Sequence, residues 1–150
     1  MHNQKGFSLI ELIVVITIIA IAVGIIIPVY SSMKPKLRLN GAARQMQGDF
    51  MRAKMQAVSQ NNNFRIIYVD DHQYKILDDD DDSGDVNGNE SIVTKDIQTN
   101  YYDVTYSSSN LDNLIFSPRG TAANLTTITL TNPSGTSTVS VSITGRIKID

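Results

Sequence analysis

The residue with the clearest chemical significance is Glu11, because it lies inside a long apolar segment with no nearby cation. The nearest basic side chain is Lys5, more than a helical turn away. An ionisable group at membrane depth costs about 2.5–3.5 kcal/mol on insertion scales, so Glu11 needs a partner. If the chain were cut between Gly6 and Phe7, a neighbouring subunit's new amine could pair with Glu11 and set the stagger between subunits. The sequence therefore predicts that Glu11 is an assembly residue.

A second chemical signal is the acidic string DDDDDSGDVNGNE over residues 78–90. Consecutive aspartates repel one another and stay solvated unless a cation joins them. One register has the spacing of a calcium loop, with carboxylate or hydroxyl ligands at positions 1, 3, 5 and 12 and glycine at position 6. These ligands would be Asp79, Asp81, Ser83 and Glu90, with Gly84 at the turn. The flanking residues read as strands, so we expect either a calcium-bound hairpin loop or a bare acidic loop, and no EF-hand.

A third signal is the pair Arg146 and Lys148, two residues apart near the end of the sequence. On a strand these side chains share a face, and one hypothesis is that they form, together with Arg119, a small basic patch that binds phosphates. The many acidic residues of the same region argue against nucleic-acid binding. The alternative is that the two cations keep an edge strand soluble.

The composition gives little support for an enzyme. There is no cysteine, the net charge is −2, and the only histidines are His2 and His72. A cysteine nucleophile and thiolate metal sites are thereby excluded. The sequence contains no phosphate-binding loop motif. Asp70 and Asp71, beside His72, are typical turn residues. We therefore predict no catalytic residues.

Glu11 must be positioned by the apolar segment that surrounds it. The run from Phe7 to Tyr30 is almost entirely apolar, and Leu12 to Ser32 carries no charge. A helix of about 20 such residues spans a membrane. Lys5 alone precedes it, which favours a cytoplasmic N-terminus and places the remainder on the far side. A secretory signal peptide, a plain single-pass anchor and a buried core helix are the alternatives, but the run is too long for the first and the other two leave Glu11 unexplained.

The helical pattern continues beyond the apolar run. Pro28 is expected to kink the helix or melt it locally, and Pro35 is expected to break it again. After Pro35, steps of four and three residues predict one buried stripe that packs on a sheet. The stripe consists of Leu39, Ala43, Met46, Phe50, Ala53 and Ala57. Asn61–Asn63 is expected to end a rod of about 50 residues.

After residue 63 the hydrophobic period drops to two, which is typical of strands. About eight short alternating segments follow, with no second helical pattern. Asn132–Gly135 has the composition of a hairpin turn. The head is therefore expected to be a pair of antiparallel sheets, or a β-sandwich, packed on the helix.

Eight contiguous residues carry a resemblance to a known family. Lys5–Leu12, which reads KGFSLIEL, resembles the class III signal of type IV prepilins and pseudopilins. That signal has a short basic leader ending in glycine, then phenylalanine, then glutamate at the fifth position of the mature chain. The resemblance implies that a prepilin peptidase cuts between Gly6 and Phe7 and methylates the Phe7 amine. It also implies that Glu11 and Pro28 serve assembly, and that the fold is the pilin-like α+β fold.

Two shorter strings narrow the resemblance. Phe116–Gly120 (FSPRG) and Gly145–Ile149 (GRIKI) resemble strings in the H-type minor pseudopilins of type II secretion and in related minor type IV pilins. The resemblance implies a structural subunit that joins a secretion pseudopilus near its tip and helps to initiate or cap it. The alternative function is that of a minor pilin involved in pilus biogenesis, adhesion or DNA uptake. Calcium stabilises some pseudopilin relatives, and it is the one cofactor that the sequence suggests.

These predictions divide the chain into four parts. Residues 1–6 are a leader removed by the peptidase, 7–30 a transmembrane assembly helix, 31–63 the amphipathic part of the helix, and 64–150 a β-rich periplasmic head. The expected location is the bacterial inner membrane, crossed once, and then a filament. The expected partners are the prepilin peptidase, other pilin or pseudopilin subunits, the inner-membrane assembly platform, and membrane lipid before assembly.

Overall fold

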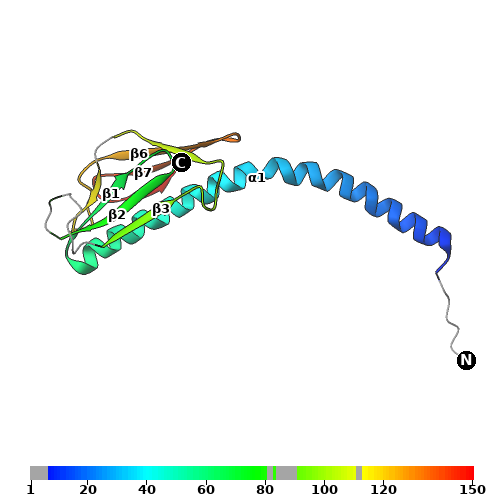
Figure 1. Ribbon diagram of the computed structural model, residues 1–150, viewed down its shortest axis with the longest axis horizontal. Helices are drawn as coiled ribbons and strands as arrows, with labels where there is room; N and C mark the ends of the chain where they lie inside the picture. Colours follow the sequence, from blue (N-terminus) through cyan, green and yellow to red (C-terminus); the bar gives the residue numbers. More distant parts are fainter. Residues whose placement is uncertain (1–6, 81–82, 84–90, 111–112) are drawn as a thin grey trace, which may run out of the picture. The chain divides into compact units, whose positions relative to one another are not determined.

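The computed structural model of the chain describes residues 7–80, 83, 91–110 and 113–150 (Figure 1). It forms two compact units, Met1–Lys34 and Pro35–Asp150, and each is described by itself. The described part of the first unit is helical from Leu9 onward. The second contains the rest of that helix and all the described strands.

A single helix, α1, runs from Leu9 to Gln60. The predicted local melting at Pro28 and the predicted break at Pro35 do not occur, since the helical assignment is continuous through both residues. Each proline removes only one backbone hydrogen bond, to the carbonyl four residues earlier. The bonds on either side are enough to keep the helix continuous.

The helix ends where the asparagine run predicted. Asn61 has a φ of 57°, and the Asn62 amide donates to the Ala57 carbonyl at 3.1 Å. A left-handed residue followed by this six-to-one bond is the Schellman arrangement, which satisfies a carbonyl at the helix end. Asparagine tolerates the left-handed conformation better than most residues, so the run stops the helix for a clear local reason.

In the first unit, every described side chain from Phe7 to Lys34 is exposed. The apolar part of α1 is long and apolar enough to cross a membrane by length and composition. Because nothing in this unit covers its valine, leucine and isoleucine side chains, they are available to lipid or to other helices.

In the second unit, one face of α1 is buried as predicted. The buried helix residues are Leu39, Ala42, Ala43, Met46, Phe50, Ala53 and Ala57. They include the whole predicted stripe and add Ala42. The small alanine side chains let the sheets approach the helix closely.

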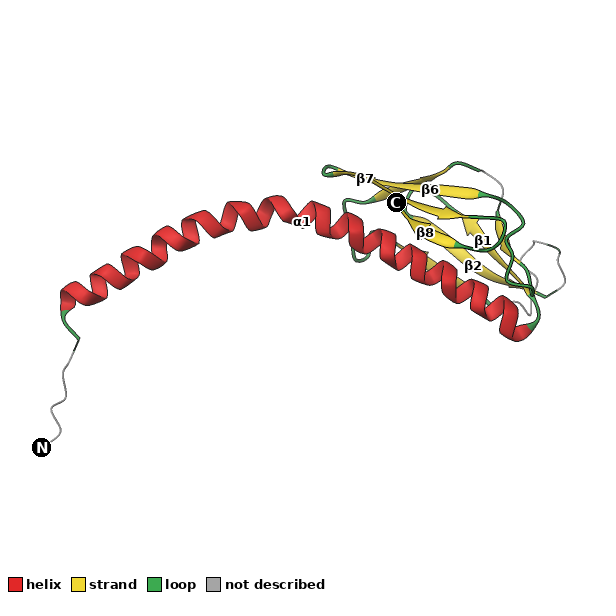
Figure 2. Cartoon of the chain, turned by 180° about the vertical axis from the view of Figure 1, so that it is seen from behind, coloured by secondary structure: helices red, strands yellow, loops and turns green. Residues whose placement is uncertain are grey.

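Eight strands are described in the second unit, in agreement with the predicted number. They are β1 (Asn63–Tyr68), β2 (Gln73–Asp79), β3 (Ile92–Asp96), β4 (Thr105–Ser108), β5 (Leu114–Phe116), β6 (Thr126–Asn132), β7 (Gly135–Val141) and β8 (Ile147–Ile149). They form two four-stranded sheets with the orders β3-β2-β1-β5 and β4-β6-β7-β8. All pairings are antiparallel. Figure 2 shows both sheets on the same side of the second half of α1, which confirms the predicted α+β arrangement of a helix packed on antiparallel sheets.

The predicted hairpin turn joins β6 and β7. Asn132 pairs with Gly135 in the ladder, and the Asn132 Oδ1 accepts from the Ser134 amide at 2.9 Å. The Asn132 Nδ2 also donates to the Pro35 carbonyl at 2.7 Å. One side chain therefore shapes the turn and ties the hairpin to the start of the helix in this unit.

Polar contacts fix the helix against the strands around the core. Tyr74 is buried, and its hydroxyl donates to Asp49 Oδ2 on α1 at 2.6 Å. Arg38 donates to both carboxylate oxygens of Asp103, at 2.6 and 2.7 Å. The guanidinium of Arg38 also lies 4.6 Å from the centre of the Tyr102 ring. A bidentate pair of this kind fixes orientation as well as distance.

Candidate processing and assembly site

The start of α1 is shaped by Ser8. The Glu11 amide approaches Ser8 Oγ at 3.4 Å, and the Leu12 amide donates to the Ser8 carbonyl at 3.2 Å. Ser8 is therefore the N-cap, and Glu11 occupies the third helical position, as in a capping box. This role of Ser8 was not among the sequence predictions, although the Ser-x-x-Glu spacing is a recognised helix-start signal. A carboxylate here is also favoured by the helix dipole.

The Glu11 side chain has no ion-pair partner among the described residues. Glu11 is exposed, and within the described parts of the chain no basic group forms an ion pair with it. Gly6 and Lys5 lie outside the described residues, so the structure does not test the cleavage site. The processing role of Gly6 and Phe7 and the assembly roles of Glu11 and Pro28 remain predictions.

The acidic string is only partly described. Asp79 lies in β2, with a side chain that is 0% exposed, and its Oδ2 accepts from Arg65 Nη2 at 2.6 Å. A calcium ion bound by Asp79 would have to displace this guanidinium. Ser83 is exposed, whereas Asp81, Gly84 and Glu90 lie outside the described residues. Calcium binding stays a prediction, and Asp79 has a structural role that the sequence analysis did not assign.

The candidate phosphate-binding cations lie on the surface. Arg146 and Arg119 are exposed, and Lys148, on β8, pairs with Asp150. The side chain of Lys148 therefore has an acidic neighbour, which weakens its attraction for phosphate. Nucleic-acid binding by Arg146 and Lys148 stays the alternative that the acidic residues argue against.

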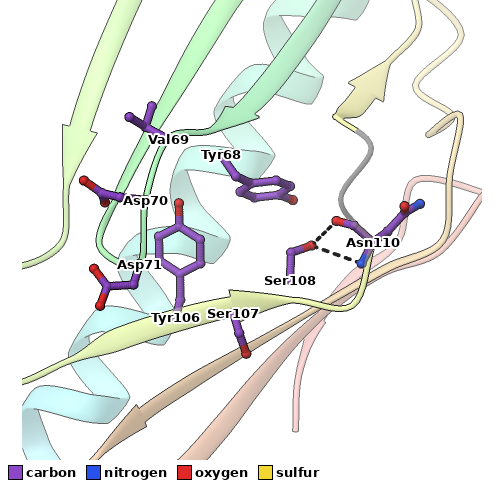
Figure 3. Close-up of a pocket in the computed structure, with 8 residues that line it drawn as sticks. All are labelled: Tyr68, Val69, Asp70, Asp71, Tyr106, Ser107, Ser108 and Asn110. Carbon is purple, nitrogen blue, oxygen red and sulfur yellow. Dashed lines mark hydrogen bonds between the residues drawn. The ribbon is translucent and has the colours of Figure 1, made fainter.

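A groove of about 380 Å³ separates the end of β1 from β4 (Figure 3). Its lining residues are Tyr68, Val69, Asp70, Asp71, Tyr106, Ser107, Ser108 and Asn110. Tyr68 and Tyr106 lie with ring centres 5.9 Å apart, and the Tyr68 hydroxyl points toward Ser108 and Asn110 in Figure 3. Burial raises the pKa of Tyr68, so its hydroxyl stays protonated and offers a donor, not a nucleophile.

Asp70, Asp71 and His72 beside this groove form the turn between β1 and β2. The Asp70 Oδ1 accepts from the His72 and Gln73 amides at 2.8 and 2.5 Å. These bonds are an Asx turn, as the residue types predicted. The three side chains lie close enough together to hold a metal ion, but Asp70 is already held by the backbone. This arrangement closes a hairpin and needs no further function.

His72 gives a testable pH dependence. A hydrogen bond to Asp71 raises the pKa of His72 above its ordinary value of 6.5; burial opposes this rise, and the charges of Asp70, Asp96 and Asp71 add to it. A raised pKa in the folded state means that His72 stabilises the fold below pH of about 6.5, and that this contribution is lost as the pH rises through the raised pKa.

We expect an NMR titration of the His72 ring to give a pKa above 6.5, and the Asp71→Asn variant to lower that pKa. The assignment is simple because His2 is the only other histidine. A His72 pKa at or below 6.5, or one unchanged in Asp71→Asn, would contradict this account.

The two short strings that carried the narrower resemblance meet in space. Gly120 and Gly145 both have a φ of 75°, and Lys54 Nζ on α1 donates to the Gly145 carbonyl at 2.8 Å. A methyl group on Gly145 would lie 2.0 Å from the Gly120 carbonyl oxygen. The strings therefore form one structural joint between two turns and the helix. Lys54 is part of it, and sequence periodicity alone gave no sign of that.

Known protein families match both the N-terminal segment and the head of the chain. Residues 42–145 match the family described as type II transport protein GspH, and residues 1–27 match the prokaryotic N-terminal methylation motif. No curated protein is significantly similar to the chain in sequence.

Among solved structures, the fold is similar to that of the type IV minor pilin FimU of Pseudomonas aeruginosa. Identity is 21% and the TM-score 0.58, over 77% of this chain and 90% of FimU. The minor pseudopilin EpsH from the type 2 secretion system of Vibrio cholerae aligns with 12% identity and a TM-score of 0.59, over 75% and 96% of the two chains. E. coli GspH aligns with 10% identity and a TM-score of 0.55, over 76% and 88%. At these identities the likeness concerns the fold.

Proposed function

The chain belongs to the GspH family of type II transport proteins, and on this basis we propose that it is a minor pseudopilin that helps to initiate or cap a secretion pseudopilus. The observation that carries the proposal is the presence of two matches in one chain. A GspH-type head follows an N-terminal methylation motif. The helix that links them exposes its apolar side chains before Lys34 and carries Glu11 in its first turn, where no described basic residue pairs with it.

The chemistry of the N-terminal segment defines the proposed life cycle. The chain first sits in the bacterial inner membrane with a cytoplasmic N-terminus and a periplasmic head. Prepilin peptidase then removes residues 1–6 and methylates Phe7. The inner-membrane assembly platform finally transfers the subunit from lipid into a filament, where Glu11 pairs with a neighbouring subunit's amine. The chain's role is structural, and the only chemistry in this scheme is done to it by the peptidase.

The alternative is a minor type IV pilin that acts in pilus biogenesis, adhesion or DNA uptake, and the likeness to FimU favours it. Deletion of the gene separates the two functions. Loss of protein export with intact pili supports the pseudopilin, whereas loss of pili or DNA uptake with intact export supports the pilin.

The assembly proposal predicts a specific defect for Glu11→Leu. The variant is expected to be cleaved and membrane-inserted normally, because leucine lowers the insertion cost. It should be at least tenfold depleted from filaments, since the subunit amine that pairs with Glu11 would lose its partner. The measurement is the amount of this chain in sheared filaments from cells that express the complete set of subunits.

Glu11→Asp serves as the matched control, because it keeps the charge and should restore part of the incorporation. The intact mass of each variant shows whether processing is normal. Equal amounts of Glu11→Leu and unmodified chain in the filaments would refute the pairing role. A general loss of cleavage would instead indicate that Glu11 is read by the peptidase.

A further inference from the structure

The strand β3 is the last strand of its sheet, and within the described part of the chain no strand pairs with its outer side. In an antiparallel pair, every second residue bonds to the neighbouring strand, and the residues between them face away from it. The Asp78 amide on β2 donates to the Ser91 carbonyl at 3.0 Å, which places Val93 among the residues that bond to β2. The backbone amides and carbonyls of Ile92 and Thr94 are therefore directed outward. We call residues 92–94 the β3 edge.

The other three sheet edges each bond to a further part of the chain. Beside β4, the Tyr106 amide donates to a carbonyl of the turn between β1 and β2 at 2.6 Å. Beside β5, the Ala123 amide donates to the Ile115 carbonyl at 2.9 Å. Beside β8, the Ile147 carbonyl accepts from Gln47 on α1 at 3.5 Å. Within the described residues, the β3 edge is thus the sheet edge without a bond of this kind.

The charged residues of β3 do not protect this edge. Proteins commonly discourage pairing at an open edge with charged side chains, above all lysine. In β3, however, Lys95 Nζ lies 3.4 Å from Asp49 Oδ1 on α1, and Asp96 Oδ1 accepts from the Gln98 amide at 2.8 Å. Both charges thus have partners inside the chain. Residues 92–94 are uncharged and consist of isoleucine, valine and threonine, which favour strands, so a complementary occupant is itself uncharged.

Val93 indicates which side chains the occupant presents. Val93 lies opposite Ile76 in the ladder, so its side chain is on the same face of the sheet as the buried Ile76 side chain. Val93 is nevertheless 47% exposed. A strand added beside β3 would place one residue next to Val93, and an apolar side chain there would bury more of it. Thr94 is exposed on the opposite face, where a polar neighbour fits.

We propose that the β3 edge binds an extended, uncharged segment of a partner protein, which adds a fifth strand to the sheet. Two residues of the segment exchange backbone hydrogen bonds with Ile92 and Thr94, and the apolar residue between them packs on Val93. The backbone bonds supply affinity, and the alternation of side chains supplies specificity. A partner helix does not fit, because its amides and carbonyls already bond one another. The surface and the chemistry of its ligand do not rest on the proposed function.

A photo-cross-linking amino acid placed at Val93 of the full chain, in its native cells, tests the proposal. Thr94→Pro removes the outward amide but no bond to β2, so the strand is retained, whereas Thr94→Ala keeps that amide and is the matched control. We expect an adduct that maps to an extended, uncharged segment of another protein. The adduct should persist in Thr94→Ala and fall at least tenfold in Thr94→Pro. No adduct, equal adducts in the two variants, or an adduct that maps to a helix or to a second copy of this chain would overturn the proposal.

Hydrogen exchange followed by NMR tests the edge without any substitution. In the detergent-solubilised full chain, the amides of Ile92 and Thr94 should exchange at least tenfold faster than those of Val93 and Lys95, which bond to β2. The probe is the peptide Lys-Thr-Val-Thr-Val-Thr-Lys at millimolar concentration, and the control peptide has proline in place of the central threonine. The probe should slow exchange at Ile92 and Thr94 at least threefold and the control should not. Equal exchange of the four amides in the free chain, or no slowing by the probe, would refute strand addition at this edge.

Discussion

Gly145→Ala is expected to destabilise the head by about 3–5 kcal/mol, a large part of the 5–15 kcal/mol that is typical of a folded domain. The φ of 75° at Gly145 is unfavourable for any residue with a side chain. In addition, the new methyl group would lie 2.0 Å from the carbonyl oxygen of Gly120, which is backbone and cannot swing away. Urea unfolding of the detergent-solubilised chain, followed by near-ultraviolet circular dichroism of its buried tyrosines, measures the loss.

Gly120→Ala is the matched control, because Gly120 has the same φ of 75°. Its methyl group would lie 3.3 Å from Lys54 Cε and 3.4 Å from Val58 Cγ2, which are side-chain atoms and can shift. The expected cost is about 1–2 kcal/mol, from the backbone conformation alone. The difference between the two variants isolates the backbone clash. Equal losses of unfolding free energy in the two variants would show that the two turns can move apart and that the clash adds no cost.

Gly6→Ala is expected to abolish processing. The processed chain should begin at Phe7, lack residues 1–6 and carry one added methyl group, whereas the variant should keep its full length and an unmethylated N-terminus. The reason is that the class III signal requires glycine before the cut, and residues 1–27 match the methylation motif. Intact mass spectrometry after co-expression with a prepilin peptidase measures both changes together.

Ser8→Ala is an informative companion to Gly6→Ala. It removes the N-cap hydroxyl that contacts the Glu11 amide, at a typical cost of about 1 kcal/mol to the helix start, but it leaves the glycine in place. Cleavage should therefore continue. If the unsubstituted chain is not cleaved, the segment is a plain membrane anchor, and Glu11 needs another explanation.

Local signals in the sequence predicted most of the fold. The apolar stripe beginning at Leu39, the asparagine stop at Asn61 and the hairpin at Asn132–Gly135 are all confirmed. Each depends on side chains and backbone within a few residues of one another. Hydrophobic periodicity and the residue types in turns are therefore enough to predict these local elements.

Predictions failed or stopped where the outcome depends on the surroundings. Pro35 does not break the helix, because the loss of one hydrogen bond is outweighed by those around it. The pairing of Asp79 with Arg65 depends on the register of β1 with β2, which residue types alone do not reveal. The processing and assembly roles of Gly6, Phe7 and Glu11 require other molecules, and remain predictions for that reason.

The position of β8 has a consequence for how the head is made. β8 pairs with β7, and Ile147 and Ile149 pack against the core, while the Ile147 carbonyl accepts from Gln47, 100 residues earlier in the chain. The helix emerges first during synthesis, yet the core that covers its apolar stripe is complete only after this late strand has arrived. Such long-range closure slows folding. A chain that is halted before residue 147 would therefore keep apolar core surface exposed and would be sensitive to proteases.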